Sequence, residues 1–137
     1  MTEKNLISEF KQAKWADYTD NQLRINKGAL PIQMKHSDGT GLPLVAYENF
    51  GADIVRFPAG KGVGTHTHIG AHILIVLNGE GFVEYEGVDH PLLPGIVYMI
   101  PGNIKHAIKA TTELILIAVG NDHKPLESEE RLQVVEK

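Results

Sequence analysis

The chain has 137 residues, of which 13 are Lys or Arg and 17 are Asp or Glu, so its formal net charge is −4 at neutral pH. A chain of this length is the size of one domain and can bury a hydrophobic core of its own. The acidic balance argues against nucleic acid as a partner, because a nucleic-acid surface needs clustered basic side chains. The lack of cysteine excludes disulfide bonds, thiolate catalysis and cysteine-ligated metal sites.

The N-terminal sequence and the apolar runs bear on location. Residues 1–5 include the acid Glu3 and lack the apolar stretch of a secretion signal. The runs Ile73–Leu77 and Leu114–Val119 are far shorter than the roughly 20 residues that a membrane-spanning helix needs. We therefore expect a cytoplasmic protein without a membrane partner.

The chain is expected to form one domain with short helical or irregular ends. No linker divides it, so a single domain is predicted over residues 1–137, with an N-terminal extension at 1–20 and a C-terminal tail at 121–137. Thr2 is a candidate cap for a helical turn in the extension, and Ser128 is a candidate cap for a short helix in the tail.

Between these ends, 14 glycines and seven prolines separate runs that are rich in Val, Ile, Leu, Phe and Tyr. Short runs of this kind, bounded by turn residues, are typical of antiparallel strands in a sandwich or barrel. The expected strands are Pro31–His36, Leu44–Asn49, Ala52–Phe57, His72–Leu77, Gly81–Tyr85, Val97–Ile100, His106–Ala110 and Glu113–Val119.

Turn-forming dipeptides predict how neighbouring strands connect. Asn78-Gly79 suits a two-residue turn with positive φ and is expected to join its flanking strands as a hairpin. Glu86-Gly87 and Pro94-Gly95 predict further turns.

Two of the expected strands are apolar on both faces. In Ile73–Leu77 every side chain is apolar, and Leu114–Val119 has the same character. A strand that is dry on both sides needs a core on one face and a second layer on the other. That second layer is either another sheet or another subunit.

Four of the seven histidines fall in two tight settings. His66 and His68 alternate, so in a strand their side chains share one face, with Cα atoms roughly 6.5 Å apart. His72 opens the next expected strand, and His106 opens a later one. Neutral imidazole is a good ligand for Zn, Fe, Ni, Cu or Mn, and three or four such ligands leave positions open for substrate or water. Together the four predict a metal site, although each alone also fits a core or surface position.

The spacing around these histidines resembles the two motifs of the cupin superfamily, G-x5-H-x-H-x(3–4)-E-x6-G and G-x5-P-x-G-x2-H-x3-N. The matching residues are Gly60, His66, His68, His72 and Gly79 for the first motif, and Gly95, Pro101, His106 and Ala110 for the second. Two of the departures from this pattern matter. His72 stands where the family usually has a glutamate ligand, and Ala110 replaces the final asparagine.

The resemblance implies an all-β fold, the cupin-type double-stranded β-helix or jelly-roll barrel of the small single-domain kind. It also implies that His66, His68, His72 and His106 bind one divalent transition metal, for which Fe, Mn, Ni and Zn are the candidates. A homodimer is suggested as well. The doubly apolar strands agree with a homodimer, although a second sheet would explain them equally well.

The resemblance further implies a small-molecule substrate. Four-histidine sites look like those of oxygenases, in which the metal orients an enolisable, diketone or polyphenol-like compound. One alternative is a metal-dependent isomerase or lyase of sugar acids. Another is a non-catalytic cupin that binds a small ligand, and a purely structural metal is a weaker option.

Outside the four-histidine set, two side chains are candidates for substrate contact in such a barrel. Arg56 is expected to clamp a carboxylate, and Tyr98 to supply an acidic hydroxyl, although either also fits an ordinary structural position. The remaining histidines, His36, His90 and His123, lie beside turns or in the charged tail and are expected at the surface.

Overall fold

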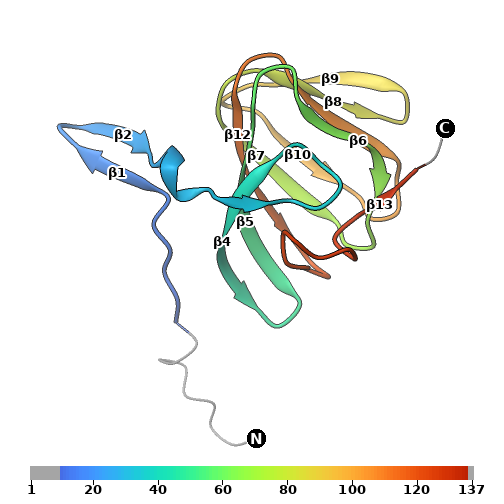
Figure 1. The fold of residues 1–137 in the computed structure, drawn as a ribbon, viewed down its shortest axis with the longest axis horizontal. Coiled ribbons are helices and arrows are strands. Elements are labelled where there is room, and N and C mark those ends of the chain that lie inside the picture. Colours follow the sequence, from blue (N-terminus) through green and yellow to red (C-terminus); the bar gives the residue numbers. More distant parts are fainter. Residues whose placement is uncertain (1–9, 136–137) are drawn as a thin grey trace, which may run out of the picture.

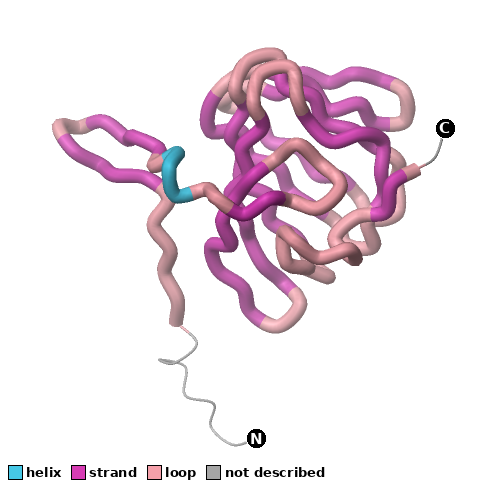
Figure 2. Tube along the Cα trace, in the orientation of Figure 1, coloured by secondary structure: helices cyan, strands magenta, loops and turns pink. Residues whose placement is uncertain are grey.

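The chain folds into two antiparallel sheets that face each other, and a separate hairpin projects from the N-terminal side (Figures 1 and 2). A computed structural model describes residues 10–135. The strands are β1 (Ala16–Thr19), β2 (Gln22–Ile25), β3 (Ile32–Gln33), β4 (Thr40–Tyr47), β5 (Phe50–Phe57), β6 (Gly62–Thr67), β7 (His72–Asn78), β8 (Gly81–Tyr85), β9 (Val88–Leu92), β10 (Val97–Ile100), β11 (His106–Ala110), β12 (Leu114–Gly120) and β13 (Gln133–Val134). Within this range the one helical element is a 3₁₀ turn, η1 (Lys27–Ala29).

The strand order is that of a jelly roll. The larger sheet runs β10-β7-β12-β5-β4-β3, and the smaller sheet runs β13-β6-β11-β8-β9. From β5 onward the chain changes sheet at every step except between β8 and β9. Two sheets built in this way enclose a single core between their inner faces. The predicted all-β jelly-roll class is confirmed.

The eight strands predicted from the sequence each overlap a strand of the structure, and the described residues contain five more, namely β1, β2, β6, β9 and β13. The additional strands lack the apolar pattern on which sequence prediction depends. β6 is rich in glycine, and β9 contains Asp89 and Pro91. Proline is tolerated here because β9 is an edge strand of its sheet.

The hairpin predicted at Asn78-Gly79 is wrong. The flanking strands, β7 and β8, belong to different sheets. Only Gly79 of the pair has a positive φ, at 83°. A Cβ on Gly79 would collide with the carbonyl oxygen of Glu113, so the glycine lets the chain cross between the sheets close to β12.

The other two predicted turns are confirmed. Glu86 and Gly87 have φ of 49° and 82°, as a two-residue hairpin turn requires, and they join β8 to β9. At Pro94-Gly95 the amide of Ile96 donates to the carbonyl of Leu93, which closes a turn with φ of 100° at Gly95.

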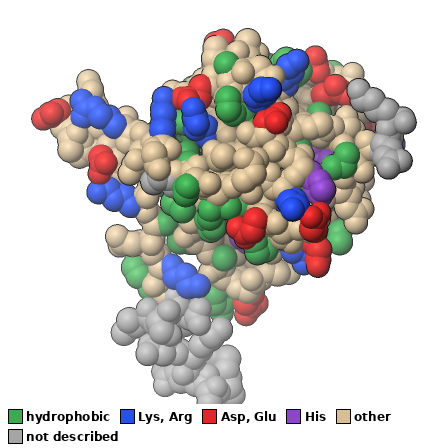
Figure 3. Space-filling view, in the orientation of Figure 1, with side chains coloured by type: hydrophobic (Ala, Val, Ile, Leu, Met, Phe, Trp, Pro, Cys, Tyr) green, Lys and Arg blue, Asp and Glu red, His purple; other side chains and the backbone are tan. Residues whose placement is uncertain are grey.

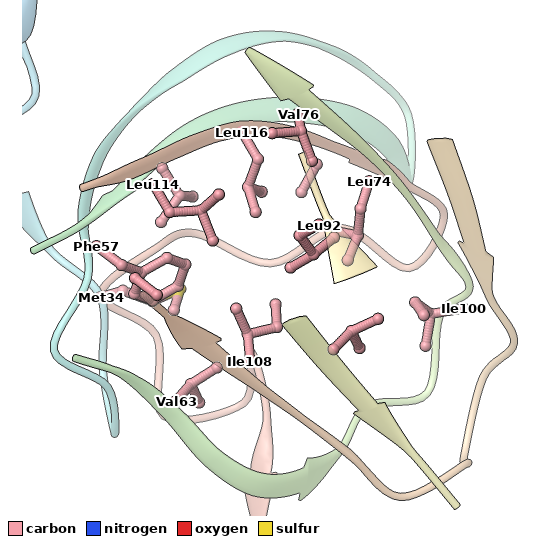
Figure 4. Close-up of a cluster of buried hydrophobic side chains, with 14 of the residues drawn as sticks. Met34, Phe57, Val63, Leu74, Val76, Leu92, Ile100, Ile108, Leu114 and Leu116 are labelled. Carbon is pink, nitrogen blue, oxygen red and sulfur yellow. The ribbon is translucent and has the colours of Figure 1, made fainter. Parts of the chain in front are cut away.

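The main core lies between the two sheets (Figure 4). Alternate side chains point inward along each strand, such as Leu74 and Val76 from β7 and Leu114 and Leu116 from β12. Leu92 closes the core from β9 and is fully buried. Burial of an aliphatic side chain of this size contributes about 1.5–3 kcal/mol. The inward face of the barrel is therefore tightly packed wherever it does not form the site described below.

The outer face of the larger sheet is covered by the N-terminal segment. Trp15, Ile25 and Leu30 pack against Ile54 and Ile115 on that face. This layer accounts for the second apolar face of β12. From the sequence alone, this covering layer was expected to be either another sheet or another subunit.

The chain ends differ from the predicted helices. Thr2 lies outside the described residues, and residues 10–15 have no regular structure. The helix predicted at Ser128 is wrong: the tail turns there and then forms β13 beside β6. The tail follows the barrel because Leu126 and Leu132 are buried in the core. None of the helices that the structure describes has the length and apolar character needed to cross a membrane.

Replacing Gly79 with alanine is expected to destabilise the fold more than the same change at Gly87. Both residues have φ close to 80°, so both alanines incur the left-handed backbone cost of about 1–2 kcal/mol. Only at Gly79 does the new Cβ also collide with backbone. Urea denaturation should therefore place Gly79→Ala about 1–3 kcal/mol below Gly87→Ala in free energy of unfolding. Equal losses of stability in the two variants would contradict the close approach of the chain at Gly79 to the backbone of Glu113.

Candidate metal centre

Three histidines meet inside the barrel. His66 on β6 and His106 on the neighbouring β11 are direct partners in the register of the smaller sheet, and His68 follows the end of β6. All three are buried, with exposed fractions of 4% for His66, 8% for His68 and 4% for His106. One ring nitrogen from each lies within 4.8 Å of the other two.

An irregularity in β6 aims His66 into the barrel. His106 pairs with His66, whereas Ile108 pairs with Val63, so two steps along β11 face three steps along β6. A bulge of this kind shifts the alternation of side chains, and it lets both Val63 and His66 face the interior. Strict alternation along the sequence would have placed them on opposite faces.

Each of the three rings is held by a backbone carbonyl two residues away in the chain. The Nδ1 atoms donate from His66 to Gly64 at 2.8 Å, from His68 to Gly70 at 2.6 Å and from His106 to Ile104 at 2.8 Å. A carbonyl oxygen can only accept, so Nδ1 carries the proton and Nε2 is left with a lone pair. The same interaction therefore sets both the tautomer and the orientation of each ring.

The arrangement of lone pairs fits a metal ion. The Nε2 atoms of His68 and His106 are 3.1 Å apart. With both protons on Nδ1, no hydrogen bond joins these two atoms, and their lone pairs face each other. Two bonds of about 2.0–2.1 Å to a shared ion place such nitrogens roughly 3 Å apart. Three imidazoles suit Zn, Fe, Ni or Mn and leave positions for oxygen ligands.

Burial keeps these imidazoles unprotonated. Desolvation lowers the pKa of His66 to about 3 and that of His106 to about 4. Desolvation also lowers the pKa of His68. A metal competes with protons for the same nitrogen, so low pKa values keep the three ligands available at neutral pH.

His72 is not a member of this cluster, which corrects the predicted four-histidine set. It begins β7 in the larger sheet, and its ring lies against that of His68, with centroids 4.1 Å apart and planes inclined by 30°. The ring fills the space over Gly120, where a Cβ would collide with it. Among the described residues no carbonyl holds either nitrogen, so nothing directs them at the common centre. Desolvation lowers the pKa of His72 to about 2.

Comparison with known proteins places this site in a family. Residues 53–120 match the model of the cupin domain. A cupin-like protein from Thermotoga maritima is 32% identical over a match that covers 61% of this chain and 68% of that chain, with a TM-score of 0.56. The chain belongs to the cupin family. The clustered histidines all lie within the residues that match the family.

Two further similarities of this cupin are to enzymes that differ in reaction class. Dimethylsulfoniopropionate lyase DddW from Ruegeria pomeroyi is 31% identical over 67 residues, which is 49% of this chain and 44% of that protein. The cupin thus spans less than half the length of this curated relative. Salicylate 1,2-dioxygenase from Pseudoaminobacter salicylatoxidans is 18% identical with a TM-score of 0.60, over 66% of this chain and 28% of that chain, and it shares the fold.

The pocket of this cupin is small and largely apolar. The four histidines, apolar side chains from both sheets and a single charged side chain, Arg131, line it. Its volume is about 40 Å³. That is room for a few water molecules or for one small functional group. No acidic side chain is among the described residues that line it.

Arg131 and His123 both converge on a buried aspartate. Asp53 is 1% exposed, and its Oδ2 accepts hydrogen bonds from His123 Nε2 and Arg131 Nη1, each at 2.8 Å. Arg131 Nη1 also donates to the carbonyl of Lys124 at 2.9 Å. The prediction that His123 is solvated is wrong, because its side chain is only 16% exposed and packs over Gly51. The sequence held one indication of this network, an aspartate inside an apolar strand, since a buried carboxylate needs cationic or donor partners.

The structure places the two predicted catalytic residues outside this pocket lining. Arg56 alternates with pocket-lining neighbours on β5 and forms an ion pair with Glu113 at 2.7 Å. Tyr98 donates its hydroxyl to the carbonyl of Pro91 at 2.9 Å. A catalytic role for either residue stays a prediction.

Acidification from about pH 7.5 to about pH 5 is expected to destabilise the metal-free protein. Unfolded histidines take up protons near pH 6.5, whereas folded His66 and His106 stay neutral down to about pH 3 and pH 4. Protons therefore favour the unfolded state throughout this interval, by about 2 kcal/mol for each residue. Urea midpoints at the two pH values measure the loss. The free energy of unfolding of a His66→Gln variant should fall less between the two pH values than that of the wild type. An equal fall would contradict the conclusion that His66 is buried in its neutral form.

Loss of a clustered histidine is expected to abolish metal binding. His66→Ala and His106→Ala should each retain less than about a tenth of the wild-type metal after dialysis, because the remaining rings supply too few ligands. His72→Ala should retain most of it, since its nitrogens lie outside the cluster. Elemental analysis by mass spectrometry reads the content directly. Full retention in both ligand variants would rule out this centre.

Proposed function

We propose that this cupin is a metal-dependent enzyme that acts on a small organic molecule, with His66, His68 and His106 as the metal ligands. The observation that carries the proposal is the convergence of three Nε2 lone pairs inside a small pocket. Each ring is already oriented by a carbonyl, and the ligand atoms lie within 4.8 Å of one another, so small shifts of the rings suffice to receive an ion.

The chemistry of this ligand set favours catalysis over a structural metal. A divalent ion held by three neutral imidazoles keeps its full charge and acts as a Lewis acid toward a bound oxygen atom. Among residues 10–135 the cluster has three protein ligands, which leaves positions for substrate, whereas structural sites are usually closed by four protein ligands. The apolar side chains around the cluster, including Leu116 and Ile100, exclude bulk water from the bound molecule. We propose Fe, Mn, Ni or Zn as the ion.

The reaction class that we favour is oxygen-dependent cleavage of an enolisable, diketone or polyphenol-like substrate, of which the polyphenol requires the pocket of about 40 Å³ to open. Of the residues that the structure describes, none with a carboxylate lines the pocket to serve as a general base. A substrate that ionises in solution, where water or buffer accepts its proton, can bind to the metal as the oxygen anion and needs no base in the pocket. This reasoning supports an oxygenase-type activity for the cupin.

A lyase is the second candidate, and the similarity to DddW favours it. A lyase has to remove a proton from carbon, so it needs a base in the pocket. Of the lining side chains, His72 is an imidazole with no hydrogen-bond partner among the described residues and no place in the metal cluster. Its pKa of about 2 makes His72 a weak base, so the lyase also requires the bound substrate to raise that pKa. The two candidates therefore differ in whether they depend on His72.

Oxygen uptake and product analysis distinguish these reactions. Metal-loaded protein is incubated with β-diketones, catechol-like compounds, α-hydroxy acids and dimethylsulfoniopropionate. An oxygenase is expected to consume oxygen with one of them, to lose at least about 100-fold in rate in His106→Ala, and to keep most of its rate in His72→Gln. Arg24→Gln, a change on the projecting hairpin, is the control.

Two other outcomes would redirect the proposal. An elimination product formed without oxygen uptake, and lost in His72→Gln, would establish the lyase in place of the oxygenase. Tight binding of a panel member without any turnover would show that the cupin is a binding protein rather than an enzyme.

A further inference from the structure

Arg131 is a charged side chain built into the wall of the histidine pocket. It lies between β12 and β13, is 8% exposed, and lines the same space as the four histidines. Desolvation is the main cause of the low pKa values of His66, His68 and His72, and the positive charge of Arg131 lowers them further. An arginine in such a position needs either protein acceptors or a ligand.

Within the described part of the chain, one nitrogen of this guanidinium has hydrogen-bond acceptors. Both protons of Nη1 are used, one by Asp53 Oδ2 at 2.8 Å and one by the carbonyl of Lys124 at 2.9 Å. Nε and Nη2 have no acceptor among the described residues. These two atoms form one edge of the guanidinium plane, and their N–H bonds are parallel, which is the geometry that matches the two oxygens of a carboxylate.

Asp53 fixes the direction of that edge. It is 1% exposed, and Oδ2 is shared between Arg131 and His123. The carboxylate and the Lys124 carbonyl together hold Nη1 from two sides, so the guanidinium cannot turn without breaking a buried hydrogen bond. Asp53 is therefore a positioning residue, and the free edge is preorganised.

The charge and size of the pocket select the ligand. Its other lining residues are imidazoles or apolar, and none is acidic among the described residues. A volume of about 40 Å³ admits a carboxylate with a short chain and excludes a large ring system unless the pocket opens. A phosphate would match the charge, but its tetrahedral oxygens fit the planar edge less well than a carboxylate does.

We propose that Arg131 binds the carboxylate of a small organic acid inside this pocket through its Nε and Nη2 atoms. The inference rests on the proposed function in one respect, that the histidine pocket is the substrate site. It adds the substrate class, a short-chain carboxylic acid, and the residue that orients it. Nε and Nη2 of Arg131 are not among the fully buried unpaired atoms of the described residues, so they stay open to a ligand that enters the pocket.

The inference is tested by titrating acetate into protein labelled with ¹⁵N-arginine. The chain has three arginines, and the variants Arg24→Gln and Arg56→Gln assign the third resonance to Arg131. Acetate is expected to shift the Nε–Hε signal of Arg131, and its neutral isostere acetamide is expected to leave that signal in place. A signal that responds to neither compound, or equally to both, overturns the inference.

Variants give an independent measure of the same contact. Arg131→Gln is expected to weaken acetate binding about 10- to 100-fold by calorimetry, as loss of a buried charge-assisted pair does. Arg131→Lys keeps the charge but lacks the planar edge, so it should also bind more weakly than the wild type. Arg24→Gln removes the same charge from an exposed position and should bind as the wild type does. Unchanged acetate affinity in folded Arg131→Lys overturns the inference.

The design separates this inference from the proposed function. Each titration is made on metal-free and on Zn-loaded protein, and metal content is measured for every variant. If Zn does not bind, the proposed metal centre fails, while the acetate response of Arg131 in the metal-free protein still decides the inference. If Zn binds normally in Arg131→Lys and acetate affinity is unchanged, the inference fails while the metal centre stands.

Discussion

The site depends on three hydrogen bonds from histidine Nδ1 to backbone carbonyls. These bonds place the proton of each ring on Nδ1. The Nε2 atoms of His66, His68 and His106 are thereby left with lone pairs directed at a common point. Desolvation then keeps the rings neutral. The cost is a close approach of two lone pairs at 3.1 Å, which the packed core must offset in the metal-free protein. A bound cation would turn this repulsion into attraction.

The rest of the barrel supports that geometry through the smaller sheet. β6 carries His66 and lies between β11, which carries His106, and β13 of the tail. Val134 of β13 pairs directly with His66, so the tail protects the edge of the strand that presents a ligand. The bulge in β6 contributes to the same geometry, because it turns His66 toward the interior beside Val63.

Asp53 connects the tail to the opposite sheet. From β5 it accepts hydrogen bonds from His123 and Arg131, both of which lie after β12. The buried carboxylate of Asp53 therefore holds the C-terminal tail, which contains β13, against the barrel. It also fixes the guanidinium of Arg131 in the pocket wall. Breaking such a buried pair by removing one partner costs several kcal/mol in general, since the other charge is left uncompensated. The tail is thus part of the barrel and of its pocket.

Apolar alternation was enough to predict most of the barrel strands and the all-β class. β7, β8, β10, β11 and β12 lie where the sequence predicts them, since their side chains are chosen by burial on a pleated surface. Strands with glycine, proline or charge were missed, because pairing in the sheet rather than apolar content holds them. The hairpin expected at Asn78-Gly79 failed for a related reason. A dipeptide reports which φ values it tolerates but not which sheet receives the next strand.

The sequence by itself determined the fold class, the cupin resemblance and three residues of the cluster, because these follow from residue type and spacing along the chain. Only the tertiary structure decided that His72 stacks on His68 outside the cluster, and that Arg131 lines the pocket from the tail. Both facts depend on contacts between segments far apart in the chain. The first needs the empty space over Gly120, and the second needs a carboxylate that lies 78 positions earlier in the sequence.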